Sequence, residues 1–180
     1  MLQAAQAAGV EVPTLCHDDR LRPAGACRLC LVSVRGATHP VPACATLAAE
    51  GLIVETHTAA LEEERRTVLA LLAQEYPAAD VERWPEKPFH RWLRRYGVMP
   101  GPVGGAPSGP PEAGAFRDAT HPYLAADLSR CIDCFRCVRI CADLQGQDVW
   151  HVTGPGPDGH IVPDGPSLLE SSCEIGRAHV

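Results

Sequence analysis

The sequence has few aromatic residues, no excess of positive charge and no long apolar run. Each of these features argues against a class of structure or function. Phe, Trp and Tyr make up 5% of the 180 residues, so the core is thin, and small domains with thin cores often depend on metals. A net charge of −6 argues against nucleic-acid binding, which needs a basic patch. We expect no membrane span and no nucleotide site, because the sequence has no long apolar run, P-loop or GxGxxG motif.

Cysteine, in contrast, is abundant. The chain has 9 cysteines, and eight of them fall into two groups of four. Without a recognisable export signal we expect the reducing cytoplasm, where grouped cysteines bind metals or act in catalysis more often than they form disulfides.

The first group is Cys16, Cys27, Cys30 and Cys44, in a loop with Pro23, Gly25 and Pro42. One CxxC pair and two separate cysteines supply the four thiolates of a 2Fe–2S cluster, and loop amides that turn inward would tune its potential. Zinc also accepts four thiolates, but its usual mark is two CxxC pairs. The spacing alone favours the cluster and leaves zinc or unligated thiols as alternatives.

The second group is Cys131, Cys134, Cys137 and Cys141, spaced C-x2-C-x2-C-x3-C. This is the bacterial ferredoxin run, in which three cysteines hold one 4Fe–4S cluster and the fourth ligates the other cluster of a two-cluster protein. Ala142 stands where a proline often follows the fourth cysteine. Zinc is again the alternative, although these cysteines are closer together than in a usual zinc ribbon.

Apolar periodicity and turn residues predict an α+β fold. We expect a helix over residues 1–8, strands over 31–34 and 51–56, and a helix from an N-cap at Thr58 to Pro77. A shorter helix should carry Phe89, Trp92, Leu93 and Tyr96. Residues 100–115 are almost entirely Pro, Gly, Ala and Ser, a linker composition that predicts a domain boundary at 100–118.

The motifs Val12-Pro13-Thr14-Leu15-Cys16-His17 and Gly25-Ala26-Cys27-Arg28-Leu29-Cys30 resemble the β-grasp 2Fe–2S domain of large redox subunits. Such domains open NAD-dependent formate dehydrogenase alpha subunits, complex I large iron–sulfur subunits and hydrogenase diaphorase subunits. The resemblance covers residues 1–57 and implies a 2Fe–2S cluster. In that family a hairpin precedes the first helix, so we expect a truncated β-grasp domain whose N-terminal hairpin is missing.

The same resemblance places Cys173 at the first cysteine of a second ferredoxin run, which would make residues 119–173 a partial dicluster 4Fe–4S domain. It implies one or two 4Fe–4S clusters whose ligand sets, with Cys141 and Cys173 among them, are incomplete in this chain. Residues 58–118 form the helical connector and linker, and residues 174–180 look like a non-native tail.

Complex I relatives usually bind another cluster through a His and three cysteines in the middle region, whereas residues 74–121 contain no cysteine and only His90 and His121. A lone histidine is more often a surface or core residue than a ligand. The stretches Lys87-Pro88-Phe89-His90-Arg91, His121-Pro122-Tyr123 and residues 145–152 resemble formate dehydrogenase alpha subunits that lack this cluster.

The resemblance therefore implies the electron-transfer segment of a formate dehydrogenase alpha subunit. It would relay electrons from a molybdopterin site in a missing downstream part to a flavin- and NAD-binding diaphorase-type subunit. The alternatives are the matching segment of an NAD-reducing hydrogenase diaphorase or complex I large subunit, and a zinc-binding structural or redox-sensing module. We expect no catalytic residue within this chain.

Overall fold

The computed structural model describes residues 1–103, 115–154 and 159–174. The chain divides into two compact units, Met1–Ser108 and Gly109–Val180, and each is described by itself. Most of the Pro- and Gly-rich stretch and residues 175–180 of the expected tail lie outside the described residues. The domain limits 1–57, 58–118 and 119–173 stay predictions.

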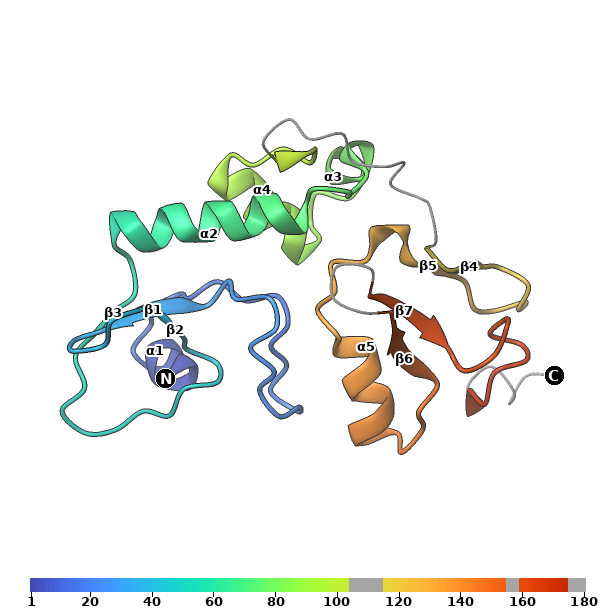
Figure 1. The fold of residues 1–180 in the computed structure, drawn as a ribbon, viewed down its shortest axis with the longest axis horizontal. Helices are drawn as coiled ribbons and strands as arrows, with labels where there is room; N and C mark the ends of the chain where they lie inside the picture. Colours follow the sequence, from blue (N-terminus) through green and yellow to red (C-terminus); the bar gives the residue numbers. More distant parts are fainter. Residues whose placement is uncertain (104–114, 155–158, 175–180) are drawn as a thin grey trace. The chain divides into compact units, whose positions relative to one another are not determined.

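The first unit contains a small antiparallel sheet in the order β2-β1-β3 (Figure 1). It is formed by β1 (Leu31–Val34), β2 (Val41–Pro42) and β3 (Val54–Glu55), with Leu31 opposite Pro42 and Ser33 opposite Glu55. The predicted strand 31–34 is confirmed. The predicted strand 51–56 is wrong at both ends, because only Val54 and Glu55 pair with β1 and a turn hydrogen bond from Leu52 N–H to Ala49 O precedes them.

The core of this sheet includes a cysteine of the first group. Leu2, Val12, Cys30, Val32 and Ala43 form one buried cluster. Leu2 belongs to α1 (Leu2–Ala7), and its N–H donates to Ala43 O at 3.0 Å. Gly9 follows this helix at φ 73, a left-handed conformation that glycine adopts without steric strain. Burial of these apolar groups fixes the backbone on both sides of Cys30.

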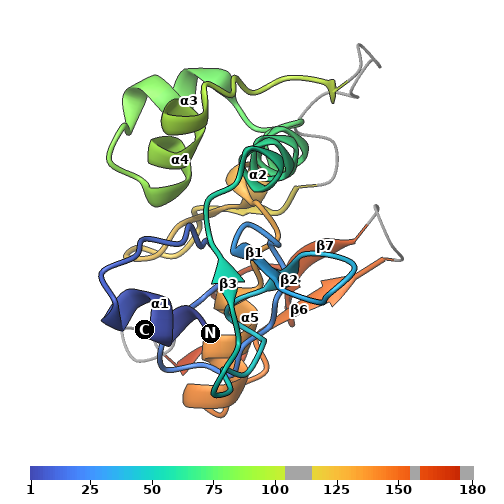
Figure 2. The same cartoon turned by 90° about the vertical axis from the view of Figure 1, so that its left-hand side faces the viewer.

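The helix α2 (Ala59–Leu72) lies against the sheet through contacts with β1 (Figure 2). Thr58 caps it as predicted, since its Oγ1 accepts from Leu61 N–H at 3.2 Å. The residues buried along one face are Leu61, Arg65 and Leu69. The helix ends at Leu72 instead of Pro77, and the residues between form a turn that leads to α3.

Two short helices follow, α3 (Ala78–Arg83) and α4 (Pro88–Tyr96). The helix predicted to carry Phe89, Trp92, Leu93 and Tyr96 is α4, which ends at Gly97 in the left-handed conformation at φ 64. Helix α3 was not expected, because Ala78 and Ala79 give it no clear apolar stripe. The helix α4 packs against α2.

The second unit is built from two short hairpins and an irregular helical segment. Strands β4 (Arg117–Asp118) and β5 (Ala126–Asp127) pair antiparallel, as do β6 (Trp150–Thr153) and β7 (His160–Pro163). Between the hairpins lie the 3-10 helix η2 (Leu128–Arg130), the helix α5 (Arg136–Arg139) and the π-helix η3 (Ile140–Leu144). Asp118 accepts from Leu168 N–H at 2.6 Å, which joins β4 to the segment before Cys173.

The arrangement is one of small helices and small sheets, as the α+β prediction requires. That the sheet is a β-grasp without its first hairpin stays a prediction. Among the described residues, no helix has the length and apolar character that crossing a membrane requires.

Shortening a buried side chain of α2 should destabilise the first unit. Leu69 is 0% exposed, whereas Leu71 on the same helix is 55% exposed. We expect Leu69→Ala to lower the free energy of unfolding by about 2–5 kcal/mol, because it removes buried methyl groups and leaves a cavity. Leu71→Ala is the matched control and should change it by less than about 0.5 kcal/mol. Urea unfolding followed by circular dichroism measures both, and equal effects would contradict the packing described.

Candidate metal centres

The first cysteine group is gathered from segments that the sheet brings together. Cys27 and Cys30 precede β1 and Cys44 follows β2, while Cys16 ends the extended segment after α1. Antiparallel pairing of β1 with β2 places Cys30 near Cys44, and Ala43 N–H donates to Cys30 O at 2.9 Å. Cys16, Cys27 and Cys30 are at most 4% exposed, and Cys44 is partly buried.

The four thiols interact with one another directly. The Cys16 sulfur is hydrogen-bonded to the thiols of Cys27 and Cys44, which lowers the pKa of Cys16 to about 2. A hydrogen bond from Cys44 lowers the pKa of Cys30 to about 6, and the pKa values of Cys27 and Cys44 are raised by the same interactions. All four thiols must lose their protons when the four sulfurs ligate iron.

Backbone amides also point at these sulfurs. The Cys27 N–H donates to Cys16 Sγ at 3.5 Å, and the amides of Ala26, Leu29 and Cys44 make similar bonds that favour the thiolate forms of Cys16, Cys27 and Cys30. Such donors stabilise negative charge on cluster sulfurs and tune the potential. The inward-turning loop amides expected from the sequence are present.

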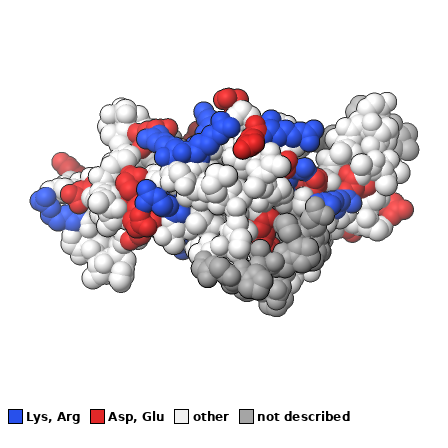
Figure 3. Space-filling model, turned by 90° about the horizontal axis from the view of Figure 1, so that it is seen from above, with Lys and Arg blue, Asp and Glu red and all other residues white. Residues whose placement is uncertain are grey.

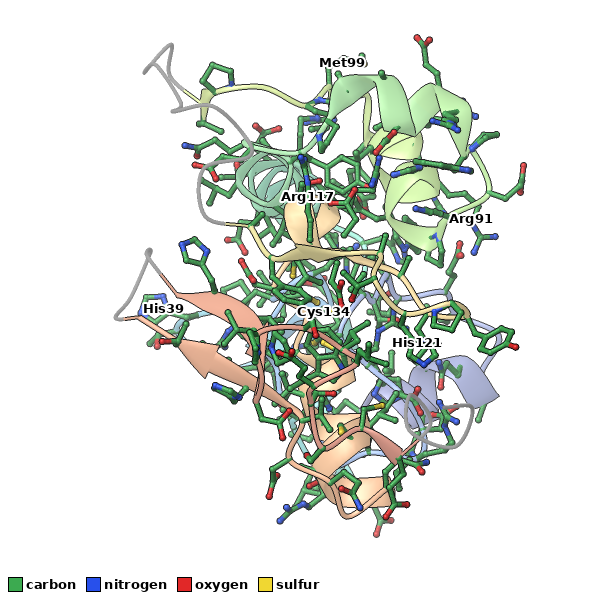
Figure 4. All side chains as sticks on the ribbon, turned by 90° about the vertical axis from the view of Figure 1, so that its right-hand side faces the viewer. His39, Arg91, Met99, Arg117, His121 and Cys134 are labelled. Atoms are coloured by element: carbon green, nitrogen blue, oxygen red, sulfur yellow. The ribbon has the colours of Figure 1, made fainter. Side chains whose placement is uncertain are left out.

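The second group lies on the segment from the end of η2 to η3. Cys131 follows η2, Cys137 is in α5, and Cys141 is in the π-helix η3, a distortion often found at functional sites. Burial raises the pKa of Cys131 to about 12 and also raises the pKa of Cys137. The charge of Cys137 interacts with those of Cys131, Cys134 and Cys141; Cys134 is marked in Figure 4.

The Cys173 N–H donates to Ser171 Oγ at 3.2 Å, and among the described residues no hydrogen bond is found between its thiol and another cysteine. Its assignment as a cluster ligand, with that of the eight other cysteines, stays a prediction.

Strained backbone is concentrated in the CxxC turns. Within the described residues, the non-glycine residues with positive φ are Arg28 at 55, Asp133 at 49 and Phe135 at 54, and each lies between two cysteines of one CxxC unit. A left-handed non-glycine residue costs about 1–3 kcal/mol and persists where the surroundings require it, often at binding sites. Here the turn directs neighbouring sulfurs and amides toward the same side, as at Cys131 Sγ, which accepts from Asp133 N–H at 3.4 Å.

Among the described residues, no three His, Cys, Asp or Glu side chains are grouped closely enough to hold a metal ion. An iron–sulfur cluster is a cage with several irons and inorganic sulfides, and its four thiolates approach from different sides.

The two histidines of the middle region have other partners. His90 is 0% exposed; its Nδ1 bonds Trp84 O at 2.7 Å and its Nε2 bonds the Tyr76 hydroxyl at 2.8 Å. His121 (Figure 4) accepts from the Tyr123 and Leu124 amides through Nδ1. His90 is a core residue whose two ring nitrogens both have partners.

Arg65 was not predicted from the sequence to belong to a site. Its side chain is 0% exposed and donates to Leu31 O, next to Cys30, at 2.7 Å. Its position four residues after Leu61 and four before Leu69 was a usable signal, because a charge on the apolar stripe of a helix needs buried partners.

Comparison with known proteins agrees with this division into two sites. Residues 1–59 match the family described as "2Fe-2S iron-sulfur cluster binding domain". Residues 121–173 match the "NADH-quinone oxidoreductase subunit 3, ferredoxin-like domain". The chain therefore carries a 2Fe–2S domain and a 4Fe–4S ferredoxin-like domain, and its cofactors are 2Fe–2S and 4Fe–4S clusters.

Similar proteins are oxidoreductase subunits. An NADH-quinone oxidoreductase subunit of Rhizobium meliloti is 33% identical over 97% of this chain and 20% of the relative. NADP-reducing hydrogenase subunit HndD of Solidesulfovibrio fructosivorans is 28% identical over 81% of this chain and 25% of the relative. A chain of an NAD+-reducing [NiFe]-hydrogenase in the H2-reduced state superposes with TM-score 0.79 and 27% identity, covering 96% of this chain and 72% of that one.

This chain spans about a fifth to a quarter of the length of these two curated relatives. Its two domains are iron–sulfur domains of the type found in NADH-quinone oxidoreductase and NAD-reducing hydrogenase subunits. The similarities support the hydrogenase and complex I alternative better than the formate dehydrogenase expected from the sequence.

The strained turn between Cys27 and Cys30 gives a test of the first site. We expect Arg28→Val to lower 2Fe–2S incorporation several-fold, because a β-branched side chain is strongly disfavoured at positive φ. Arg28→Asn removes the same charge but tolerates the left-handed conformation, so it should keep near-normal incorporation. Iron and acid-labile sulfide per chain measure the effect after anaerobic reconstitution. Equal incorporation in both variants would show that the turn conformation does not matter.

Proposed function

We propose that this chain is the electron-relay segment of an NAD-linked oxidoreductase of the NADH-quinone oxidoreductase or NAD-reducing hydrogenase type. The observation that carries the proposal is the presence of two cysteine groups in separate units, the first with its four thiols in mutual contact. When bound, iron–sulfur clusters accept and release single electrons. The chain would be part of an oxidoreductase and would contain no catalytic residue of its own.

Separate sets of cysteines ligate the two redox centres. Cys16, Cys27, Cys30 and Cys44 ligate the 2Fe–2S cluster, and burial of three of them limits the access of water to the site. Cys131, Cys134 and Cys137 ligate a 4Fe–4S cluster. Cys141 either completes that set or, with Cys173, belongs to a second one. The loop amides donate hydrogen bonds to the sulfurs and so stabilise the negative charge on them.

The partner we propose is a flavin- and NAD-binding subunit of the diaphorase type, with no nucleic acid involved. The name of the superposed structure includes NAD+ reduction, and the relatives' names include NADH in one case and NADP reduction in the other. Free thiolates and clusters of this kind suit the reducing cytoplasm, which stays a prediction.

A formate dehydrogenase alpha subunit is the second candidate. It is favoured by the middle region, where residues 74–121 contain no cysteine and His90 is engaged by Tyr76 and Trp84. Complex I relatives usually use a His and three cysteines there. The molybdopterin site would then belong to a part of the polypeptide outside this sequence.

Replacing one cysteine of either group should abolish the signal of that group's cluster and leave the signal of the other cluster. In the complex that contains this chain, we expect Cys27→Ser to abolish the 2Fe–2S signal in electron paramagnetic resonance and keep the 4Fe–4S signal. Cys134→Ser should do the reverse, because the two sites use different ligands. Each variant is the control for the other, and loss of both signals from either variant would contradict two independent sites.

Electron relay should depend on both groups. We expect NADH to reduce the clusters of the wild-type complex, and the substrate-driven reduction of NAD+ to fall at least about 100-fold in Cys27→Ser and Cys134→Ser, since a gap in the chain slows transfer. Assays with H2, quinone and formate as the second substrate separate the candidates. Full activity in both variants, or bound zinc in place of iron, would refute the proposal.

A further inference from the structure

We propose that Arg65 is a buried counter-charge that sets the reduction potential of the 2Fe–2S site, in partnership with Glu62. The inference rests on the proposed function, because it requires a redox cluster on Cys16, Cys27, Cys30 and Cys44. Both residues belong to α2, outside the cysteine loop, and nothing in the cysteine motifs points to them.

The contacts of Arg65 tie α2 to the sheet beside the site. One guanidinium nitrogen, Nη2, donates to Leu31 O at 2.7 Å and to Thr56 O at 2.8 Å. Leu31 follows Cys30 directly, so this nitrogen lies within about 9 Å of the Cys30 Cα, given standard backbone dimensions. Arg65 therefore fixes the backbone at a ligand and also brings a positive charge near it.

Glu62 holds the other side of the guanidinium. Its Oε1 accepts from Arg65 Nη1 at 2.8 Å, and its side chain is 35% exposed while that of Arg65 is 0% exposed. The Tyr96 hydroxyl of α4 is also hydrogen-bonded to Glu62. The pair thus has an orientation: its positive member donates to Leu31 O of β1, and its negative member is the more exposed of the two.

Burial of the Arg65 charge costs free energy, because the charge loses its contact with water. Arg65 Nε is buried with no hydrogen-bond partner among the described residues, and a buried ion pair is often no more stabilising than apolar residues of similar volume. On the face shown in Figure 3, Lys and Arg side chains lie at the surface near Asp and Glu side chains. Stability alone is a weak reason for a charged residue at this core position.

The charge has a clear effect on a redox group nearby. Uptake of an electron adds negative charge to the site, and a fixed positive charge stabilises the reduced form. The interaction is stronger in the protein interior than in water, and salt screens buried charges far less than surface charges. Arg65 should therefore raise the potential and Glu62 should lower it.

The test compares the midpoint potential of the 2Fe–2S signal among variants of the complex that contains this chain. Arg65→Met should lower the equilibrium constant for reduction about tenfold, which is about 59 mV for one electron. Glu62→Gln should raise it by a smaller factor, and the double variant should return close to wild type. Arg66→Met is the matched control: Arg66 forms the same i,i+3 pair with Glu63 but is 49% exposed, and its substitution should leave the potential unchanged.

The opposite signs separate an electrostatic effect from a merely structural one. If Arg65→Met assembles no cluster, Glu62→Gln and the charge-keeping Arg65→Lys still decide, because the first should raise the potential and the second should keep it within a factor of about three of wild type. Potentials that do not change with Glu62→Gln, or that move in the same direction in Arg65→Met and Glu62→Gln, would overturn the inference. A wild-type protein without a 2Fe–2S signal would instead overturn the proposed function.

Discussion

Mutual contact among the thiols of Cys16, Cys27, Cys30 and Cys44 is the constraint on which the first unit depends. Four sulfurs held together in a buried loop repel one another when ionised, and here the repulsion is relieved by shared protons and by backbone amides that donate to sulfur. A cluster of two irons replaces those protons with stronger bonds. The chemistry of this loop, with four thiols and inward-directed amides, therefore suits a metal cluster.

The rest of the unit serves to hold that loop. The sheet places Cys30 and Cys44 side by side through the pairing of β1 with β2, Cys30 belongs to the apolar core, and Arg65 holds the next carbonyl along. Each CxxC turn contains a residue in a strained left-handed conformation, and the same device occurs in both units. Two unrelated small folds thus solve the same problem, which is to aim closely spaced sulfurs at one side of a turn.

The sequence was most informative where chemistry restricts spacing. The cysteine motifs predicted the two sites and both kinds of cluster, and Thr58 marked the start of a helix because N-caps have specific chemistry. It was less informative where packing decides: Val54–Glu55 is the only paired part of the expected strand 51–56, and α3 formed without an apolar stripe. Arg65 was missed because its partners, Leu31 and Thr56, are distant in sequence. The cysteine motifs did not decide which type of enzyme the chain belongs to. The similarities to known proteins favour the hydrogenase and complex I type over formate dehydrogenase.

The most direct test of the central claim is Mössbauer spectroscopy of the protein loaded with 57Fe, combined with chemical determination of iron, acid-labile sulfide and zinc. We predict that one preparation contains both 2Fe–2S and 4Fe–4S spectra, with sulfide matching iron and little zinc. A preparation with zinc bound to the cysteines, no sulfide and no cluster spectrum would contradict the account.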